Sequence, residues 1–345
     1  MSICTAPSSS SSAAARSSSR FRSSSNPRWT GRAVPFGGDN AAMPALFLVA
    51  SIPSPHSSTV DLGPLTIHLY GLTLLAAIVA CIWITGRRWV ARGGDWDLVY
   101  RCALWGVAAG IVGARLYHLA TSWSEVPDPK WKGAFEIWHG GLGVWGGIAA
   151  GVVVGSAIAR RAGANVGLLM DCVAPGLLVA QAIGRLGNWF NQELYGKPTS
   201  LPWGLEIDSS HYGSAFYPAG TTFHPTFLYE LIWNLFAALL LVWIGRRFTI
   251  RPPGLFALYV TFYCFGRFWI EMLRIDTAHH IAGLRLNDWV AAIGFVAGLV
   301  WFRRIQRRGA AAKPRRRLRL RRRRAASAPP HTAMAVPRGR VRRGR

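Results

Sequence analysis

Four polar residues interrupt one apolar stretch of the chain: Tyr263, Arg267, Glu271 and Arg274. Their offsets of four, four and three residues place them on one face of a helix, because such residues are neighbours on a helix surface. Ionisable groups at membrane depth are costly and mark candidate functional sites. Two arginines around one glutamate leave a surplus positive charge, which favours an anion site. The alternative is a structural Arg–Glu pair between helices.

A second candidate anion ligand is Arg185, in the segment 184–188 (GRLGN). A guanidinium group gives phosphate oxygens planar, paired hydrogen bonds, so Arg185 is the expected phosphate contact. Further polar residues are expected at the same membrane depth, although each is also a common interfacial anchor or helix end. They are His68, Tyr70, Arg115, Tyr117, His118, His139, His224 and Glu230. Together they predict a polar cavity that opens to the outer leaflet.

The sequence gives no sign of a metal or nucleotide cofactor. Its cysteines stand singly, without the spacing of metal ligands or a CxxC motif. A Walker loop and a GxSxG elbow are also missing. We therefore expect neither a metal nor a nucleotide cofactor.

These polar residues lie among seven apolar runs, each close to the length of about 20 residues that crosses a bilayer. The runs are near 65–85, 98–120, 142–159, 166–183, 226–245, 254–273 and 285–302. Charges concentrate between the runs, which argues against the alternative of a large soluble helical core. The sequence predicts an all-α, polytopic membrane protein with about seven transmembrane helices.

The arginines between the runs predict the orientation. Arginine clusters follow the first, third, fifth and seventh runs, whereas the other connections are longer and contain fewer cations per residue. Cytoplasmic loops carry the excess of Lys and Arg. The N-terminus is therefore expected outside the cell and the C-terminus in the cytoplasm.

The net charge of +25 comes mostly from the two ends of the chain. Residues 1–42 form a Ser- and Arg-rich leader that is expected to be disordered, and Met43 is the alternative start of the protein. Residues 43–308 are the predicted membrane domain, and 309–345 are an Arg-rich tail expected to be disordered. Such a tail is expected to touch anionic lipid headgroups. Nucleic acid is not an expected partner, because no folded reader accompanies the charge.

Five ordered blocks over roughly 60–305 resemble the prolipoprotein diacylglyceryl transferase family. They are 68–71 (HLYG), 138–147 (WHGGLGVWGG), 184–196 (GRLGNWFNQELYG), 224–230 (HPTFLYE) and the late face of Arg267, Glu271 and Arg274. The resemblance implies an enzyme of the bacterial plasma (inner) membrane with its active site toward the outer side. Its reaction is the first step of lipoprotein maturation.

In that reaction, the diacylglyceryl group of phosphatidylglycerol moves to the thiol of the lipobox cysteine in a secreted prolipoprotein. A thioether forms and glycerol phosphate leaves. The implied partners are therefore phosphatidylglycerol and prolipoprotein signal peptides, and no cofactor is implied. Two other classes stay open: a transporter or lipid-binding protein that uses the same cavity, and a structural tether that acts through the Arg-rich tail.

The resemblance also implies roles for individual residues. The implied catalytic residues are Arg267, Arg185, Glu193 and Tyr70. The implied phosphatidylglycerol ligands are Arg185, Asn188, Gly196 and Tyr263. Glu271 and Arg274 would orient Arg267 from behind, and His139 would support the site.

Activation of the thiol is the point at which the chain departs from the family pattern. Many members have a histidine at the position of Trp145. A free thiol, with a pKa near 8.5, needs a base or a positive field to become a thiolate. Either His139 takes the role of base or the arginine-rich field lowers the thiol pKa; we favour the field.

Overall fold

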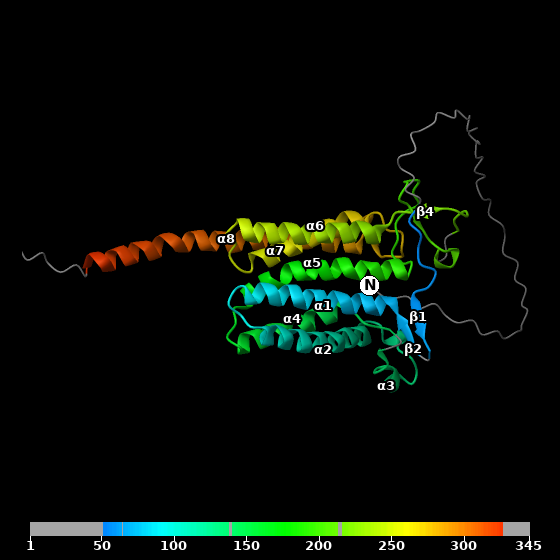
Figure 1. The fold of residues 1–345 in the computed structure, drawn as a ribbon, viewed down its shortest axis with the longest axis horizontal. Helices are drawn as coiled ribbons and strands as arrows, with labels where there is room; N and C mark the ends of the chain where they lie inside the picture. The colour runs from blue at the N-terminus through cyan, green and yellow to red at the C-terminus, as the bar shows by residue number, and fades with distance from the viewer. Residues whose placement is uncertain (1–50, 64, 138–139, 213–215, 327–345) are drawn as a thin grey trace, which may run out of the picture.

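The computed structural model describes residues 51–326, except 64, 138–139 and 213–215. The predicted leader 1–42, Met43 and the candidate base His139 lie outside the described residues. The long helices are α1 (Leu69–Val90), α2 (Trp96–Thr121), α4 (Val144–Arg161), α5 (Val166–Phe190), α6 (Thr226–Arg247), α7 (Gly254–Glu271) and α8 (Leu286–Ala326). Each overlaps one of the predicted apolar runs, and they lie side by side in a bundle (Figure 1).

Short elements gather at one end of this bundle, which is the end where α1 and α6 begin (Figure 1). They include α3 (Lys130–Gly133) and the 3₁₀ turns η1 (Trp123–Glu125) and η3 (Ser209–His211). Three antiparallel strand pairs were not predicted: β1 (Thr59–Leu62) with β2 (Leu65–His68), β3 (Leu205–Glu206) with β4 (Thr222–Phe223), and β5 (His280–Ile281) with β6 (Leu284–Arg285). Their strands are too short to give an alternating pattern.

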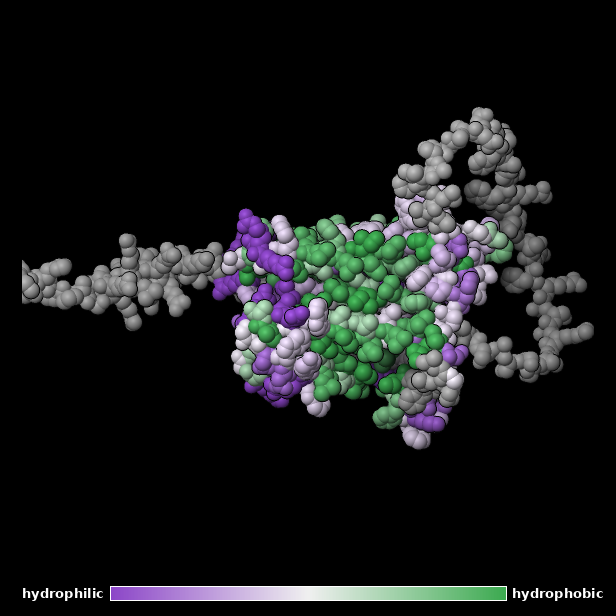
Figure 2. All heavy atoms as spheres, viewed as in Figure 1, coloured by the Kyte–Doolittle hydropathy of each residue, from purple (hydrophilic) through white to green (hydrophobic). Residues whose placement is uncertain are grey.

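The surface and the helix lengths are those of a polytopic membrane protein. Among the described residues, five helices are long and apolar enough to cross a bilayer: α1, α2, α5, α6 and the part of α8 at Leu286–Arg307. Helix α4 ends on Arg160 and Arg161, and α7 contains Arg267 and Glu271, which lowers the mean hydropathy of both. Figure 2 shows a broad apolar band between two more polar ends. The prediction of a mainly helical membrane protein is confirmed.

Charged residues define several helix ends. Helices α1, α4 and α6 have arginine pairs in their last turns, which is favourable because the C-terminal end of a helix dipole is negative. At the start of α5, the side chain of Asn165 accepts a hydrogen bond from the backbone N–H of Leu168.

Helix α8 continues to Ala326, so the first part of the tail predicted to be disordered is helical. Extending an existing helix requires no new nucleation, which favours this continuation.

Helices α2 and α4 contact each other through glycine. A Cβ atom added to Gly146 of α4 would lie 2.2 Å from the carbonyl oxygen of Gly113 in α2. One added to Gly113 would lie 2.6 Å from the carbonyl oxygen of Gly146. Small residues of this kind let helix backbones approach closely in a membrane.

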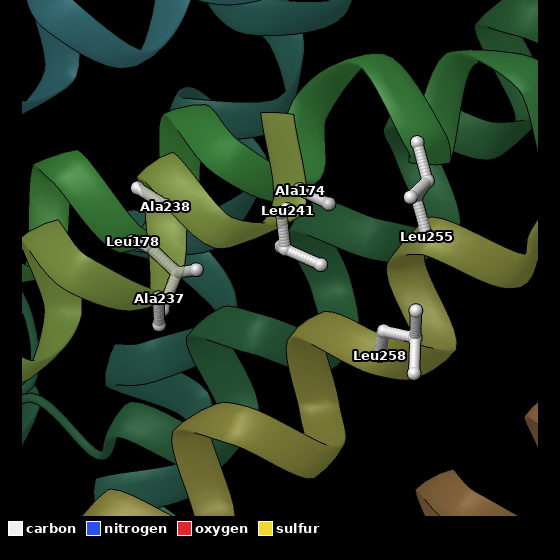
Figure 3. Packing of buried hydrophobic residues seen from close by; sticks show 7 residues of the cluster. All are labelled: Ala174, Leu178, Ala237, Ala238, Leu241, Leu255 and Leu258. Atoms are coloured by element: carbon white, nitrogen blue, oxygen red, sulfur yellow. The ribbon is translucent and has the colours of Figure 1, made fainter. Parts of the chain in front are cut away.

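A buried cluster holds α5, α6 and α7 together (Figure 3). Its members are alanines and leucines: Ala174, Leu178, Ala237, Ala238, Leu241, Leu255 and Leu258. Alanine on one helix makes room for leucine on the next, so the three backbones are fixed at close range. These are the helices that carry the charged residues described next.

Candidate active site

Three helices bring Arg185, Glu230 and Arg267 together at the end of the bundle that carries the strands. Arg185 lies in the last two turns of α5, and Arg267 lies one turn before the end of α7. Glu230 lies one turn after the start of α6 at Thr226. The chain reverses between these helices, so residues far apart in sequence meet at one level.

Glu230 bridges the two arginines. Its Oε1 lies 2.9 Å from Nη2 of Arg185, and its Oε2 lies 3.3 Å from Nη1 of Arg267. The Glu230 side chain is only 5% exposed, so this pairing is shielded from water. One carboxylate thus spans two guanidinium groups from different helices.

Glu271 is a second bridge behind Arg267. Its Oε2 lies 2.6 Å from Nη2 of Arg267 and 3.5 Å from Nη1 of Arg274. Its Oε1 lies 3.1 Å from Nε of Arg285 and accepts a 2.9 Å hydrogen bond from Nδ2 of Asn287. The predicted face of Arg267, Glu271 and Arg274 is therefore present, and Arg267 is held between two carboxylates.

The network ends on Asp276, in the connection between α7 and β5. Its carboxylate accepts hydrogen bonds of 2.7 Å from Nε of Arg274 and 2.9 Å from Nη2 of Arg285. Burial alone raises the pKa of this carboxyl. The hydrogen bond from Arg274 and the charges of both arginines outweigh burial and hold the pKa below its ordinary value. Asp276 is thus the ionised outer end of the network.

The segment after Arg185 forms a second branch. Asn188 accepts a 2.8 Å hydrogen bond from Nη1 of Arg185 and donates one of 2.7 Å to Oε1 of Glu193. The backbone around Glu193 is strained, since Gln192 and Leu194 have φ angles of 50° and 60°. This tight turn returns the Glu193 carboxylate to the end of α5, next to Asn188.

Gly196 positions the loop and does not line the cavity. Its backbone pairs with Arg274 in an isolated antiparallel bridge, and its N–H donates a 3.0 Å hydrogen bond to the carbonyl of His224. A Cβ atom at this position would lie 2.7 Å from Cβ of His224, so a larger residue would push the loop away. The predicted headgroup ligand is therefore a glycine that ties three segments together.

The two predicted tyrosines border the network. A Cβ atom at Gly187 would lie 2.5 Å from Cδ2 of Tyr70, which places the Tyr70 ring directly on α5. Tyr70 is close enough to Glu193 and Arg185 to interact with their charges. Tyr263 interacts in the same way with Glu230 and both site arginines.

A small cavity lies at the centre of these residues. It is lined by Arg185, Asn188, Leu194, Thr226, Phe227, Glu230 and Arg274. Its volume of about 10 Å³ is about the space that one water molecule needs. A lipid headgroup is larger than this space, so its binding there requires side chains of the network to move apart.

Other predicted cavity residues have different roles. Arg115 is buried and donates hydrogen bonds to the backbone carbonyls of Gly133, Ala134, Gly140 and Gly141, so it organises the loop after α2. Trp145, the position at which the sequence departs from the family pattern, is 55% exposed at the start of α4.

Glu230 has a more central position than was predicted for it, and Arg285, Asn287 and Asp276 were not predicted as site residues. The density of polar residues in 274–288 was an available signal, because this segment covers the connection between two apolar runs and the start of the second run. The predicted surplus of positive charge around Glu271 is also wrong. Glu230 and Asp276 supply carboxylates from outside the helical face from which that surplus was counted.

The described residues also bear on metal binding. Among them, no group of three or more His, Cys, Asp or Glu side chains is placed to hold a metal ion. The charged side chains of the site pair with one another instead.

The fold and the site together define a polytopic membrane protein with an arginine–carboxylate network at one end of its helical bundle. A family model described as prolipoprotein diacylglyceryl transferase matches residues 57–304. The chain belongs to this family, which confirms the resemblance found in the sequence.

Similar proteins with curated functions carry one name, phosphatidylglycerol–prolipoprotein diacylglyceryl transferase. The protein of Cutibacterium acnes is 52% identical over 260 residues, which cover 75% of this chain and 88% of the relative. That of Bifidobacterium adolescentis is 47% identical, with 77% and 83% covered. That of Streptomyces griseus is 48% identical, with 73% and 77% covered.

Proposed function

We propose that this chain transfers the diacylglyceryl group of phosphatidylglycerol to the lipobox cysteine of prolipoproteins, the activity named for its relatives. One observation carries the proposal: Arg185 and Arg267 converge on the two oxygens of a single carboxylate, Glu230. A phosphodiester also presents two oxygens side by side that share one negative charge. The same pair of guanidinium groups is therefore suited to bind the lipid phosphate.

In this proposal, each site residue has its own role. Arg185 and Arg267 bind the phosphate, and Arg267 stabilises the charge that grows on it as glycerol phosphate leaves. Asn188 and Glu193 fix the guanidinium of Arg185. The remaining residues surround this centre: Tyr70 and Tyr263 as polar walls, Gly196 as the loop anchor, and Glu271 and Arg274 as supports of Arg267.

The proposed membrane arrangement has seven crossing helices, with the site at the outer side. It is supported by the arginine-rich ends of α1, α4 and α6, which lie opposite the site and fit the cytoplasmic face. The N-terminus is then outside the cell and the C-terminus inside. The Arg-rich segment after α8 would meet anionic headgroups of the inner leaflet.

The test is an assay of purified protein with labelled phosphatidylglycerol and a lipobox peptide. We expect glycerol phosphate release and a lipidated peptide, both lost in Arg185→Ala and Arg267→Ala. The matched control is Arg101→Ala, because Arg101 is an exposed arginine of α2 paired only with Asp97 in the described structure. Lipid binding without release would instead identify a lipid-binding protein or transporter.

A further inference from the structure

The charges of the site network balance. Its arginines are Arg185, Arg267, Arg274 and Arg285, and its carboxylates are Glu193, Glu230, Glu271 and Asp276. With as many carboxylates as arginines, the network provides no surplus positive field to turn a thiol into a thiolate. Activation of the lipobox cysteine therefore requires a group that accepts its proton.

We propose that Glu230 is this group: the lipid phosphate displaces its carboxylate from Arg185 and Arg267, and the freed carboxylate takes the proton of the lipobox thiol. The inference rests on the proposed transferase function. It assigns to Glu230 a direct part in the reaction, beyond holding two arginines in place.

The position of Glu230 distinguishes it from the other carboxylates. Among the described residues, Glu230 is the only carboxylate that lines the small cavity. Glu271 is completely buried behind Arg267 and is held by Arg274, Arg285 and Asn287 as well. Glu193 is turned toward Asn188. A substrate group that enters the cavity therefore reaches Glu230 first.

The same displacement makes the carboxylate of Glu230 available as a base. In the structure, each of its oxygens faces a guanidinium group, Oε1 that of Arg185 and Oε2 that of Arg267. Once the phosphate has taken both guanidinium groups, these oxygens can accept the proton of the thiol. Substrate binding therefore also releases the base.

The proposed step combines proton transfer to Glu230 with substitution at a glyceryl carbon. The thiol proton moves to Glu230, and the sulfur forms a bond to the glyceryl carbon that carries the phosphate ester. The bond between that carbon and the ester oxygen breaks, and its electron pair stays on the oxygen of the departing glycerol phosphate. Glu230 then gives its proton to this phosphate, and its carboxylate returns to the two arginines.

The test compares two lipobox peptides, one with cysteine and one with selenocysteine, whose selenol is already ionised at neutral pH. With the cysteine peptide, Glu230→Gln is expected to lower the rate about 100-fold or more, the usual contribution of a general base. With the selenocysteine peptide, we expect a deficit smaller than about tenfold, because no base is needed. Equal deficits with both peptides would overturn the proposal, as would an unimpaired Glu230→Gln with the cysteine peptide.

Glu271→Gln is the matched control, because it also removes one carboxylate from Arg267. It should lose activity equally with both peptides, since Glu271 only positions Arg267. Rescue of this variant by selenocysteine would count against a special role for Glu230. Near-total loss of activity with the cysteine peptide in His139→Ala, restored with the selenocysteine peptide, would give the role of base to His139 and overturn the proposal.

The variant Glu230→Asp tests whether the loss in Glu230→Gln reflects the missing carboxyl group or a folding defect. Glu230→Asp keeps a carboxyl group, so its ratio of cysteine to selenocysteine rates should stay near that of the unmodified protein. A ratio that falls as far as in Glu230→Gln would contradict the proposal. Failure of the transferase function itself would look different, because the unmodified protein would then release no glycerol phosphate with either peptide.

Discussion

Nδ2 of Asn188 donates a hydrogen bond of 2.7 Å to Oε1 of Glu193. Because the other end of the same amide accepts from Arg185, position 188 needs one donor and one acceptor. An aspartate there has no donor when ionised and would repel Glu193. Asn188 therefore connects the guanidinium of the proposed phosphate site to the turn that follows α5.

The first prediction concerns this amide. Asn188→Asp should lower the rate of glycerol phosphate release at least about tenfold, because the loss of a buried hydrogen bond to a charged group costs about 1.5–3 kcal/mol. Asn165→Asp is the control: it makes the same change at the other end of α5, where aspartate caps a helix equally well. Equal activity in both variants would contradict a role for the Asn188 amide.

The second prediction concerns the contact between α2 and α4. Gly146→Ala should destabilise the protein by about 1–3 kcal/mol, because its methyl group would overlap the backbone of Gly113. Gly155→Ala, also in α4, should cause no loss, since a Cβ atom there meets nothing within 4 Å. Thermal unfolding in detergent measures both. A Gly146→Ala protein as stable as Gly155→Ala would mean that the helices are not in contact.

The third prediction follows from the depressed pKa of Asp276. A carboxyl whose folded pKa lies below its unfolded value of about 3.9 stabilises the protein above that pH, and this contribution disappears as the pH falls through the folded pKa. Asp276→Asn should lower the melting temperature near pH 7 and weaken its fall below about pH 4. Melting curves recorded across this range give the measurement, and parallel pH profiles for the two proteins would refute it.

The fourth prediction separates the enzyme from a tether that acts through its tail. Removal of 309–345 should leave the transfer rate within about twofold, because no residue of the site network lies beyond Asn287 in the described structure. Transfer rates in vesicles with and without anionic lipid would show any effect of the tail at a membrane surface. Loss of transfer in detergent on removal of the tail would favour the tether.

Much of the fold was predictable because membrane helices are specified locally. An apolar run of sufficient length identifies a helix without knowledge of its neighbours. The face of Arg267, Glu271 and Arg274 was predictable for the same reason, since helical spacing alone aligns these residues. Arg185 was identified by its residue type and its motif.

The partners of these residues were not predictable in this way. Glu230 meets Arg267 across 37 positions of sequence, and Arg285 reaches Glu271 across a turn. Such pairings depend on how helices pack and where loops reverse, which periodicity does not report. The error about surplus charge has this origin: a count along one helix omits the carboxylates that other segments supply.

Helices α2 and α4 contact each other in a different way from α5, α6 and α7. One pair of helices is constrained by shape, because glycine carbonyls occupy the space that any side chain would need. Helices α5, α6 and α7 are held by a buried apolar cluster and also carry the ion pairs of the site. The charged residues of α5, α6 and α7 could therefore be redesigned while the contact between α2 and α4 is kept. Changing that contact is harder, because one added carbon atom at Gly146 would force the two helices apart.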